Sequence, residues 1–310
     1  MVPPPRLVAT DLDGTLLRSD GSLSPSTARA LRLAAAAGVP VVPATARPLR
    51  WLSRYSWAAG LRYLVFGNGA VVYDTGAEAV VSRHDLSPET LAELCERISA
   101  LLPSARFAVE IEDGRLMRHE PEYPLRSDLG QPGVAPAPRD ELVRRPALKL
   151  LVKAPGADPV ALTSGVAAAV GDRAEATVSA PQGDLLELAA PGVTKATGLA
   201  AVAARLGVPP ADVVAFGDMP NDLPMLRWAG QGVAVANAHP DVLAAADEVT
   251  GSNDEDGVAT WLAAALGRAA TLPHRAGPAP RTATGVPGGH ATPGAPAAPA
   301  SRAPAPTEQP

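Results

Sequence analysis

The stretch Leu7-Val8-Ala9-Thr10-Asp11-Leu12-Asp13-Gly14-Thr15 decides the fold of this 310-residue chain. Its first four residues predict a short buried strand that ends at Asp11. In a sheet of parallel strands, ligands bind outside the carboxyl ends of the strands. Asp11 and Asp13 therefore stand where a binding site is expected.

Strands and helices alternate outward from this stretch. Ser24 predicts an N-cap, Pro25 the first helical position and Gly38 the end of the same helix. Further apolar runs predict strands at 39–44, 64–66, 213–216 and 233–235. Apolar strands joined by helices are typical of a parallel sheet that is covered on both faces. We therefore expect an α/β fold with a doubly wound, Rossmann-like parallel sheet.

The middle of the chain has a different pattern. A helix is predicted over 87–102, and two apolar runs flank Asp113-Gly114, which is a strong hairpin signal. The further elements expected here are a strand at 148–152, a helix at 159–170 and strands near Thr177 and Leu185. Together they predict an α+β module with an antiparallel sheet, inserted between two parts of the parallel sheet.

Four segments are expected along the chain. The parallel-sheet core spans residues 1–81 and 187–267, and the inserted module spans residues 82–186. From about residue 268 to 310, proline alternates with alanine, glycine and threonine, and large apolar residues nearly vanish. Such a composition removes backbone donors and buries little area, so we expect this tail to be disordered.

The composition excludes several classes of protein. The net charge of −5 argues against a nucleic-acid binder, because such proteins carry a basic face. The single cysteine, Cys95, excludes an internal disulfide framework. No apolar stretch has the ~20 residues needed to span a bilayer. Because the first residues also lack the pattern of a signal peptide, we expect a cytoplasmic protein that binds no membrane.

Polar residues follow several predicted strands at one edge of the parallel sheet. Asp11, Asp13, Asp218 and Asp222 would repel one another there without a counter-ion. Carboxylate oxygens suit Mg²⁺, which takes one or two of them and keeps other positions for carbonyls, water and phosphate. The metal also screens an anionic nucleophile from an anionic phosphate. The pattern indicates a magnesium-assisted phosphoryl-transfer site.

Groups that can hold a phosphate are predicted at the same edge. Thr45 supplies a hydroxyl, and Lys195, at the start of a helix, supplies a compact positive charge. Only three of the 27 basic residues are lysines, so this chain strongly prefers arginine. A lysine in such a chain is a weak indication of a specific role. No Gly-x-x-x-x-Gly-Lys-Ser/Thr loop occurs, which excludes an ordinary nucleoside triphosphatase.

Each feature taken alone has a simpler explanation. Asp-Gly-Thr after a strand can be a turn, and Asn221 with Asp222 can cap the next helix. Thr45 and Arg47 can be a loop hydroxyl and a surface cation, and Lys195 a solvated helix residue. Their combination favours the phosphoryl-transfer site, because the features occur in order and each stands at an element boundary on the predicted edge.

Short segments also share their order and residue types with the motifs of one known family. They are Asp11–Leu17, Thr45–Arg47, Asn68–Ala70, Lys195, Gly217–Asp222, Asn237–Pro240 and Gly251–Ala259. On these residues the chain resembles the haloacid dehalogenase superfamily of phosphohydrolases, in its Cof-type subfamily, over residues 6–267. The resemblance implies a core of that family's fold with an inserted α/β cap domain. Loops of the cap, at 120–145 and 182–184, are then expected to select the substrate.

The resemblance implies separate roles for the aspartates. Asp11 resembles the nucleophile that forms an aspartyl-phosphate and binds Mg²⁺. Asp13 resembles the general acid and base, with its backbone carbonyl on the metal. Asp218 resembles a further metal ligand, and Asp222 a ligand or a partner that acts through water. Mg²⁺ is therefore the expected cofactor.

Other matched positions are implied to hold the substrate. The expected phosphate contacts are the Leu12 amide, Thr45, Ala46, Lys195 and Asn221. Arg47 matches a position that often faces the substrate. Ala46 and Ala196 stand where glycine is common, and Pro43 is unusual before the second motif, but none of these departures removes a catalytic group.

The expected activity is that of a Mg²⁺-dependent phosphatase acting on a small phosphorylated metabolite, of the sugar phosphate, flavin or pyridoxal phosphate class. Two alternatives stay open. One is a phosphomutase of the same superfamily, and the other is a non-catalytic phospho-ligand-binding protein. The intact Asp11, Asp13, Lys195 and Asp218 argue against the second. We expect a monomer or a homodimer.

Overall fold

A parallel sheet of five strands contains the strand that precedes Asp11. In spatial order the strands are β14 (Glu248–Thr250), β13 (Gln231–Val235), β12 (Val213–Gly217), β1 (Leu7–Thr10) and β2 (Val41–Pro43). All neighbouring pairs are parallel, and β1 lies between β12 and β2. The doubly wound parallel sheet predicted from the sequence is confirmed.

The structure is a computed structural model that describes residues 4–125, 130–178 and 185–270. Residues 271–310 of the tail predicted at 268–310 and the segment 182–184 lie outside the described residues. Residues 126–129 of the predicted loop at 120–145 lie outside them as well.

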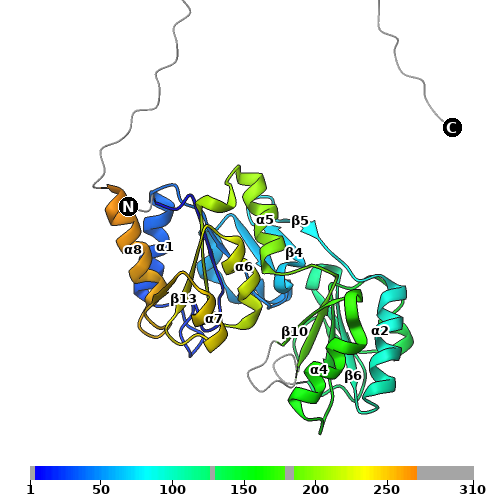
Figure 1. Cartoon of the computed structure of the whole chain (residues 1–310). Coiled ribbons are helices and arrows are strands. Elements are labelled where there is room, and N and C mark those ends of the chain that lie inside the picture. Colours follow the sequence, from blue (N-terminus) through cyan, green and yellow to red (C-terminus); the bar gives the residue numbers. More distant parts are fainter. Residues whose placement is uncertain (1–3, 126–129, 179–184, 271–310) are drawn as a thin grey trace, which may run out of the picture. The chain divides into compact units, whose positions relative to one another are not determined.

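Helices cover both sides of the parallel sheet (Figure 1). They are α1 (Pro25–Ala36), α5 (Lys195–Leu206), α6 (Leu223–Trp228), α7 (Pro240–Ala245) and α8 (Gly257–Ala270). Helix α1 begins as predicted, because the Ser24 side chain accepts a hydrogen bond from the Thr27 backbone N–H and Pro25 holds the first helical position. It packs against α8, at the far side of the sheet from α5.

The predicted strand at 64–66 does not extend the parallel sheet. It is β3 (Tyr63–Phe66), and it forms an antiparallel sheet with β4 (Val71–Asp74) and β5 (Ala79–Arg83). One bridge, between Ala44 and Val65, joins β3 to the end of β2. The chain reverses at Gly67-Asn68-Gly69, where Asn68 has φ = 56° and both glycines have positive φ. This turn sends the next strand back along β3 instead of into a crossover helix.

A second large sheet follows in the middle of the chain. Its order is β10 (Glu175–Val178), β11 (Leu186–Ala189), β9 (Lys149–Lys153), β6 (Arg106–Ile111), β7 (Leu116–His119) and β8 (Val134–Pro136). Only β7 and β8 are parallel. The hairpin predicted around Asp113-Gly114 joins β6 to β7. Strand β8 was not predicted, because three residues between turns carry no readable alternation.

Each large sheet has its own hydrophobic core. One cluster fills the space between the parallel sheet and its helices, and another lies between the six-stranded sheet and the helices α2 (Pro88–Leu101) and α4 (Pro159–Val170). The short helix α3 (Arg139–Leu142) borders the second cluster. All described residues belong to one compact unit. The boundaries expected at 81/82 and 186/187 stay a prediction; they fall within β5 and at the first residue of β11.

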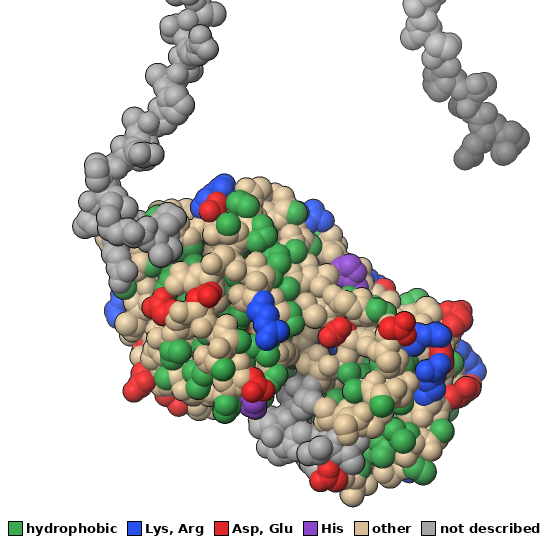
Figure 2. Space-filling model, in the orientation of Figure 1, with side chains coloured by type: hydrophobic (Ala, Val, Ile, Leu, Met, Phe, Trp, Pro, Cys, Tyr) green, Lys and Arg blue, Asp and Glu red, His purple; other side chains and the backbone are tan. Residues whose placement is uncertain are grey.

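On the face seen in Figure 2, acidic and basic side chains are interspersed rather than gathered by sign. Within the described ranges, no helix has the length and apolar character that crossing a bilayer requires.

Candidate active site

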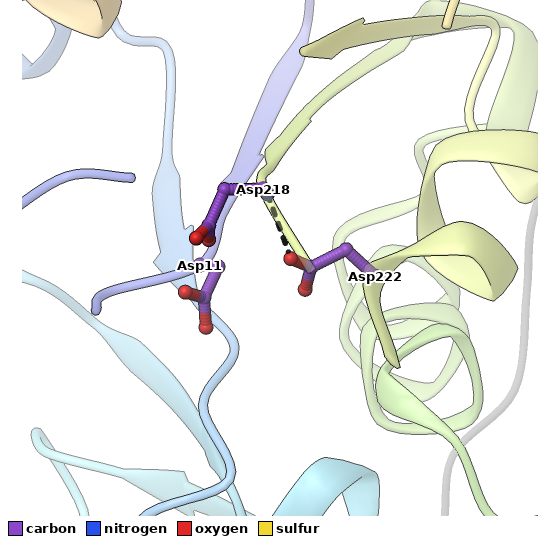
Figure 3. Close-up of side chains that lie close together, drawn as sticks. All are labelled: Asp11, Asp218 and Asp222. Carbon is purple, nitrogen blue, oxygen red and sulfur yellow. Dashed lines mark hydrogen bonds between the residues drawn. The ribbon is translucent and has the colours of Figure 1, made fainter. Parts of the chain in front are cut away.

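Two neighbouring strands bring the acidic residues together. Strands β1 and β12 pair in register, with Thr10 opposite Phe216. Asp11 follows the first strand and Asp218 the second, and the Asp11 backbone N–H donates to the Phe216 carbonyl at 3.0 Å. The carboxyl ends of parallel neighbours meet at one sheet edge. The two carboxylates therefore lie side by side, although their positions in the chain are far apart (Figure 3).

A third carboxylate, that of Asp222, completes a buried acidic cluster. Oxygen atoms of Asp11, Asp218 and Asp222 all lie within 4.8 Å of one another. All three residues are buried, and Asp222 has no exposed surface. Buried carboxylates are unfavourable unless they are paired, hydrogen-bonded or bound to a metal.

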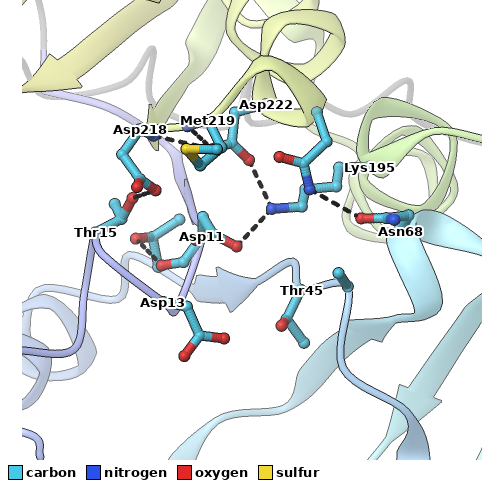
Figure 4. A network of polar contacts seen from close by, with 12 residues as sticks. Asp11, Asp13, Thr15, Thr45, Asn68, Lys195, Asp218, Met219 and Asp222 are labelled. Atoms are coloured by element: carbon cyan, nitrogen blue, oxygen red, sulfur yellow. Dashed lines mark hydrogen bonds and ion pairs between the residues drawn. The ribbon is translucent and has the colours of Figure 1, made fainter. Parts of the chain in front are cut away.

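Lys195 pairs with two members of this cluster. It is the first residue of α5, and its Nζ donates to Asp11 Oδ1 at 2.5 Å and to Asp222 Oδ1 at 2.6 Å (Figure 4). Burial alone would lower the pKa of the Lys195 ammonium, but the two carboxylates raise it above its usual value. Lys195 is therefore a fixed positive charge at the bottom of the site.

Hydrogen bonds from the backbone fix the orientation of Asp222. Its Oδ2 accepts from the N–H groups of Asp218 at 2.9 Å and Met219 at 3.0 Å. Its other oxygen, Oδ1, accepts a hydrogen bond from Lys195 Nζ. Thr15 Oγ1 donates to Asp218 Oδ1 at 2.7 Å. The contacts of Asp222 hold neighbouring groups in place, whereas the Asp218 carboxylate lies beside that of Asp11 (Figure 3).

The three carboxylates of the cluster carry more negative charge than Lys195 alone can offset. Burial raises the pKa of Asp11 well above its usual value; Lys195 opposes this, and Asp222 and Asp218 add to it. Burial and the charge of Asp222 raise the pKa of Asp218 to about 6. One lysine faces three carboxylates, so a divalent cation would offset the remaining repulsion. The donor set, which consists of oxygen atoms, fits such an ion.

Asp13 lies apart from this cluster. Its side chain is 51% exposed and points away from Asp218 (Figure 4). Arg47 donates to both of its oxygens, from Nε at 2.5 Å and from Nη2. Arg47 also donates from Nη1 to the Tyr55 hydroxyl at 2.7 Å. The structure thus pairs two residues that the sequence assigned to separate tasks.

The other predicted phosphate contacts surround the same edge. Thr45 is buried, and its Oγ1 accepts from the Arg47 backbone N–H at 3.1 Å. The Leu12 side chain is buried in the core, and its peptide group links Asp11 to Asp13. Asn221 Nδ2 donates to Asn68 Oδ1 at 3.1 Å. Figure 4 shows Thr45 and Asn68 on the Lys195 side of Asp11, away from Asp218.

Several residues in contact with the site were not predicted. Thr15 and Asn68 belong to segments that match the family's motifs, but no role was predicted for either side chain. Lys149 donates to the Ala46 carbonyl at 2.7 Å and pairs with Glu187 at 2.5 Å. The scarcity of lysine was the one signal that could have drawn attention to Lys149.

Comparison with known proteins places this geometry in context. A family model described as haloacid dehalogenase-like hydrolase matches residues 8–262. The 5-amino-6-(5-phospho-D-ribitylamino)uracil phosphatase YitU of Bacillus subtilis is 29% identical over 260 residues, which cover 83% of this chain and 96% of that protein. An HMP-PP phosphatase of Cronobacter sakazakii is 31% identical over 249 residues, which cover 77% and 87% respectively.

A solved structure has the same fold. The crystal structure of a haloacid dehalogenase-like hydrolase from Bacteroides thetaiotaomicron is similar with a TM-score of 0.68 at 25% identity. The match covers 83% of this chain and 98% of that one. The likeness therefore includes both the parallel sheet and the six-stranded sheet.

Proposed function

Because the chain belongs to the haloacid dehalogenase-like hydrolase family and is a phosphatase of that family, we propose that it removes phosphate from a small metabolite with Mg²⁺ through an aspartyl-phosphate on Asp11. One observation carries the proposal. The buried Asp11 carboxylate lies 2.5 Å from Lys195 Nζ and beside two further carboxylates. A nucleophile, a phosphate-binding cation and a metal-binding cluster are thus adjacent.

Asp11 supplies the nucleophile in this proposal. One of its carboxylate oxygens attacks phosphorus, and the bond from phosphorus to the ester oxygen breaks. The leaving oxygen takes its proton from Asp13. Water then attacks the aspartyl-phosphate, loses a proton to Asp13 and releases inorganic phosphate, which restores Asp11. Lys195 and Thr45 hold the oxygens of the transferring group in both steps.

The residues that would hold Mg²⁺ are Asp11 and Asp218 through their carboxylates and Asp13 through its backbone carbonyl. When bound, the ion screens the charge of Asp11 from that of the phosphate. Asp222 supports this site by holding Lys195 and the Asp218 backbone N–H. A contact from Asp222 to the metal through water is compatible with this role.

Asp13 becomes available for proton transfer when Arg47 leaves it. A phosphate ester is a stronger partner for a guanidinium than a half-exposed carboxylate, because it carries more negative charge and accepts the same two parallel hydrogen bonds. Arg47 therefore transfers from Asp13 to the substrate on binding. The exchange couples the arrival of substrate to the release of the acid and base.

The substrate is proposed to be a small phosphorylated metabolite of the sugar phosphate, flavin or pyridoxal phosphate class. The name of the Bacillus subtilis relative specifies a phosphorylated ribitylamino-uracil, which supports a substrate of this size. The six-stranded sheet, with its loops, is proposed as the cap that recognises the part of the substrate beyond the phosphate.

A phosphate-release screen tests the proposal. Purified protein is incubated with a panel of phosphorylated metabolites, with Mg²⁺ or with EDTA, and the organic product is identified together with inorganic phosphate. We expect release that depends on Mg²⁺ and yields the free alcohol. An isomeric sugar phosphate without free phosphate would identify a phosphomutase, and binding without turnover would leave only a phospho-ligand-binding protein.

A further inference from the structure

Lys149 links the six-stranded sheet to the loop that follows β2. Its Nζ donates to the Ala46 carbonyl at 2.7 Å and to Glu187 Oε2 at 2.5 Å. Glu187 pairs across the sheet with Leu151, two residues from Lys149, so the two charged side chains share one face. Lys149 is only 1% exposed. A buried ammonium with two charge-assisted hydrogen bonds has a well-defined position.

The bond to Ala46 fixes the peptide group between Ala46 and Arg47. A peptide group is planar, so holding its oxygen also sets the direction of its N–H. That N–H, which belongs to Arg47, donates to Thr45 Oγ1 at 3.1 Å. A threonine hydroxyl has one hydrogen, and an oxygen that accepts from a backbone N–H directs this hydrogen elsewhere. The Thr45 hydroxyl is thereby oriented to donate to a phosphate oxygen.

Glu187 continues the connection to a second phosphate-binding segment. Its Oε2 also accepts from Asn68 Nδ2 at 3.0 Å, and Asn68 Oδ1 accepts from Asn221 Nδ2 at 3.1 Å. The Asn68 backbone N–H donates to the Thr45 carbonyl at 3.0 Å. Lys149, Glu187 and Asn68 therefore join Thr45 to Asn221, which lie far apart in the sequence.

The charges along this connection are balanced. Glu110 pairs with Lys149 across the sheet and forms a buried ion pair with Arg50 at 3.0 Å. Negative and positive charges alternate from Glu187 through Lys149 and Glu110 to Arg50. Removing one of them leaves a buried charge uncompensated, which is destabilising by itself. A test at Lys149 therefore also needs a variant that removes the charge of Glu187.

We propose that Lys149 is a positioning residue for phosphate binding. Through the Ala46–Arg47 peptide it directs the Thr45 hydroxyl, and through Glu187 and Asn68 it holds the amide of Asn221. The inference rests on the proposed function, because it requires the phosphoryl group to bind between Thr45 and Asn221.

The test compares K149M, K149R and K149M/E187Q with the matched control K153M. Lys153 is a second buried lysine of β9 on the same face of the sheet, and its Nζ donates to the Pro124 carbonyl instead. Binding of inorganic phosphate in the presence of Mg²⁺ is measured by calorimetry, and amide hydrogen exchange is followed in a peptide covering residues 45–50. Hydrolysis of p-nitrophenyl phosphate gives kcat and KM, and thermal unfolding reports on stability.

We expect phosphate binding roughly tenfold weaker in K149M and in the double variant, as for the loss of one charge-assisted hydrogen bond. KM should rise more than kcat falls, exchange at 45–50 should be faster, and K149R should recover part of the affinity. K153M should stay within twofold of the wild type. Equal phosphate affinity and exchange in K149M and K153M, with an active wild type, would overturn the inference and leave the proposed function standing.

Failure of the proposed function gives a different result. A wild type that neither binds phosphate nor hydrolyses any ester contradicts that function and, with it, the role of Lys149 in phosphate binding. The exchange measurement then reports only whether Lys149 orders the backbone at 45–50. In a wild type that binds phosphate, unchanged exchange in K149M overturns the positioning role alone.

Discussion

The guanidinium of Arg47 donates to both carboxylate oxygens of Asp13. The pair joins the proposed substrate-facing residue to the proposed acid and base before any substrate is present. Solvent reaches both side chains, since that of Asp13 is 51% exposed and that of Arg47 is 22% exposed. Partly exposed ion pairs contribute little to stability, so exchange of partners costs little free energy.

Replacing Arg47 should therefore damage substrate use without damaging the fold. In R47M the phosphate ester loses its guanidinium partner, and a hydrogen bond to a charged group contributes about 1.5–3 kcal/mol, or roughly 10- to 100-fold in kcat/KM. Steady-state kinetics with p-nitrophenyl phosphate measure this loss, and thermal unfolding should change by only a degree or two. An unchanged kcat/KM would mean that Arg47 serves Asp13 alone.

Asp11 should be indispensable for turnover. D11N keeps the shape of the side chain but replaces the nucleophilic oxygen by a poor nucleophile, so we expect a loss on the order of 10³-fold or more. D13N should also be slow, yet it keeps the backbone carbonyl and should still bind Mg²⁺. Phosphate-release assays and circular dichroism of both variants provide the measurement. Ordinary turnover by D11N would rule out the covalent mechanism.

Mg²⁺ should stabilise the protein, because three buried carboxylates face one lysine. An ion at about 100 times its Kd adds about 2.7 kcal/mol to the free energy of unfolding, which raises Tm by roughly 5–10 °C in a protein of this size. D218N removes one of the carboxylates and should lose most of this shift. Thermal unfolding with MgCl₂ is compared with NaCl of equal ionic strength. The same shift in wild type and D218N would place the metal elsewhere.

Gly69 should be required for the position of Lys195. A Cβ atom at Gly69 would lie 1.9 Å from the Thr194 carbonyl oxygen, and φ there is +101°. G69A should displace the start of α5 and cost about 2–5 kcal/mol, from overpacking and from backbone strain together. G38A is the matched control, because its φ is +70° and nothing lies within 4 Å of the added Cβ. Urea unfolding and kcat are measured for both variants. A loss seen in both comes from the backbone strain of a positive φ, and the additional loss in G69A comes from the contact with Thr194.

The sequence predicts most of what local pattern and parallel-sheet geometry determine. Asp11 and Asp218 could be brought together because each follows a strand of the same sheet, and the carboxyl ends of such strands coincide. The N-cap at Ser24 and the hairpin at Asp113-Gly114 depend only on neighbouring residues. The antiparallel pairing of β3 with β4 was the exception, since it depends on the turn at Gly67-Asn68-Gly69, whose left-handed residues include an asparagine.

Contacts between the six-stranded sheet and the loops that follow β2 and β3 could not be predicted in this way. Lys149 meets Ala46 across 103 residues, and Glu187 meets Asn68 across 119. No periodicity or turn signal encodes the way in which one sheet faces another. The pairing of Arg47 with Asp13 was missed for a related reason, because a family motif assigns each residue a role toward the substrate and says nothing of contacts without it.

The position of β1 between β2 and β12 has a consequence for synthesis on the ribosome. One edge of the nucleophile's strand stays without a partner until Val213–Gly217 emerges, after the whole six-stranded sheet has been translated. At roughly 5–20 residues per second this interval lasts about 10–40 s. During that time the open strand is a place where nascent chains can associate wrongly or chaperones can bind. A translation product that stops before Asp218 carries the nucleophile but lacks both Asp218 and Asp222, so we expect such premature termination to yield no active phosphatase fragment.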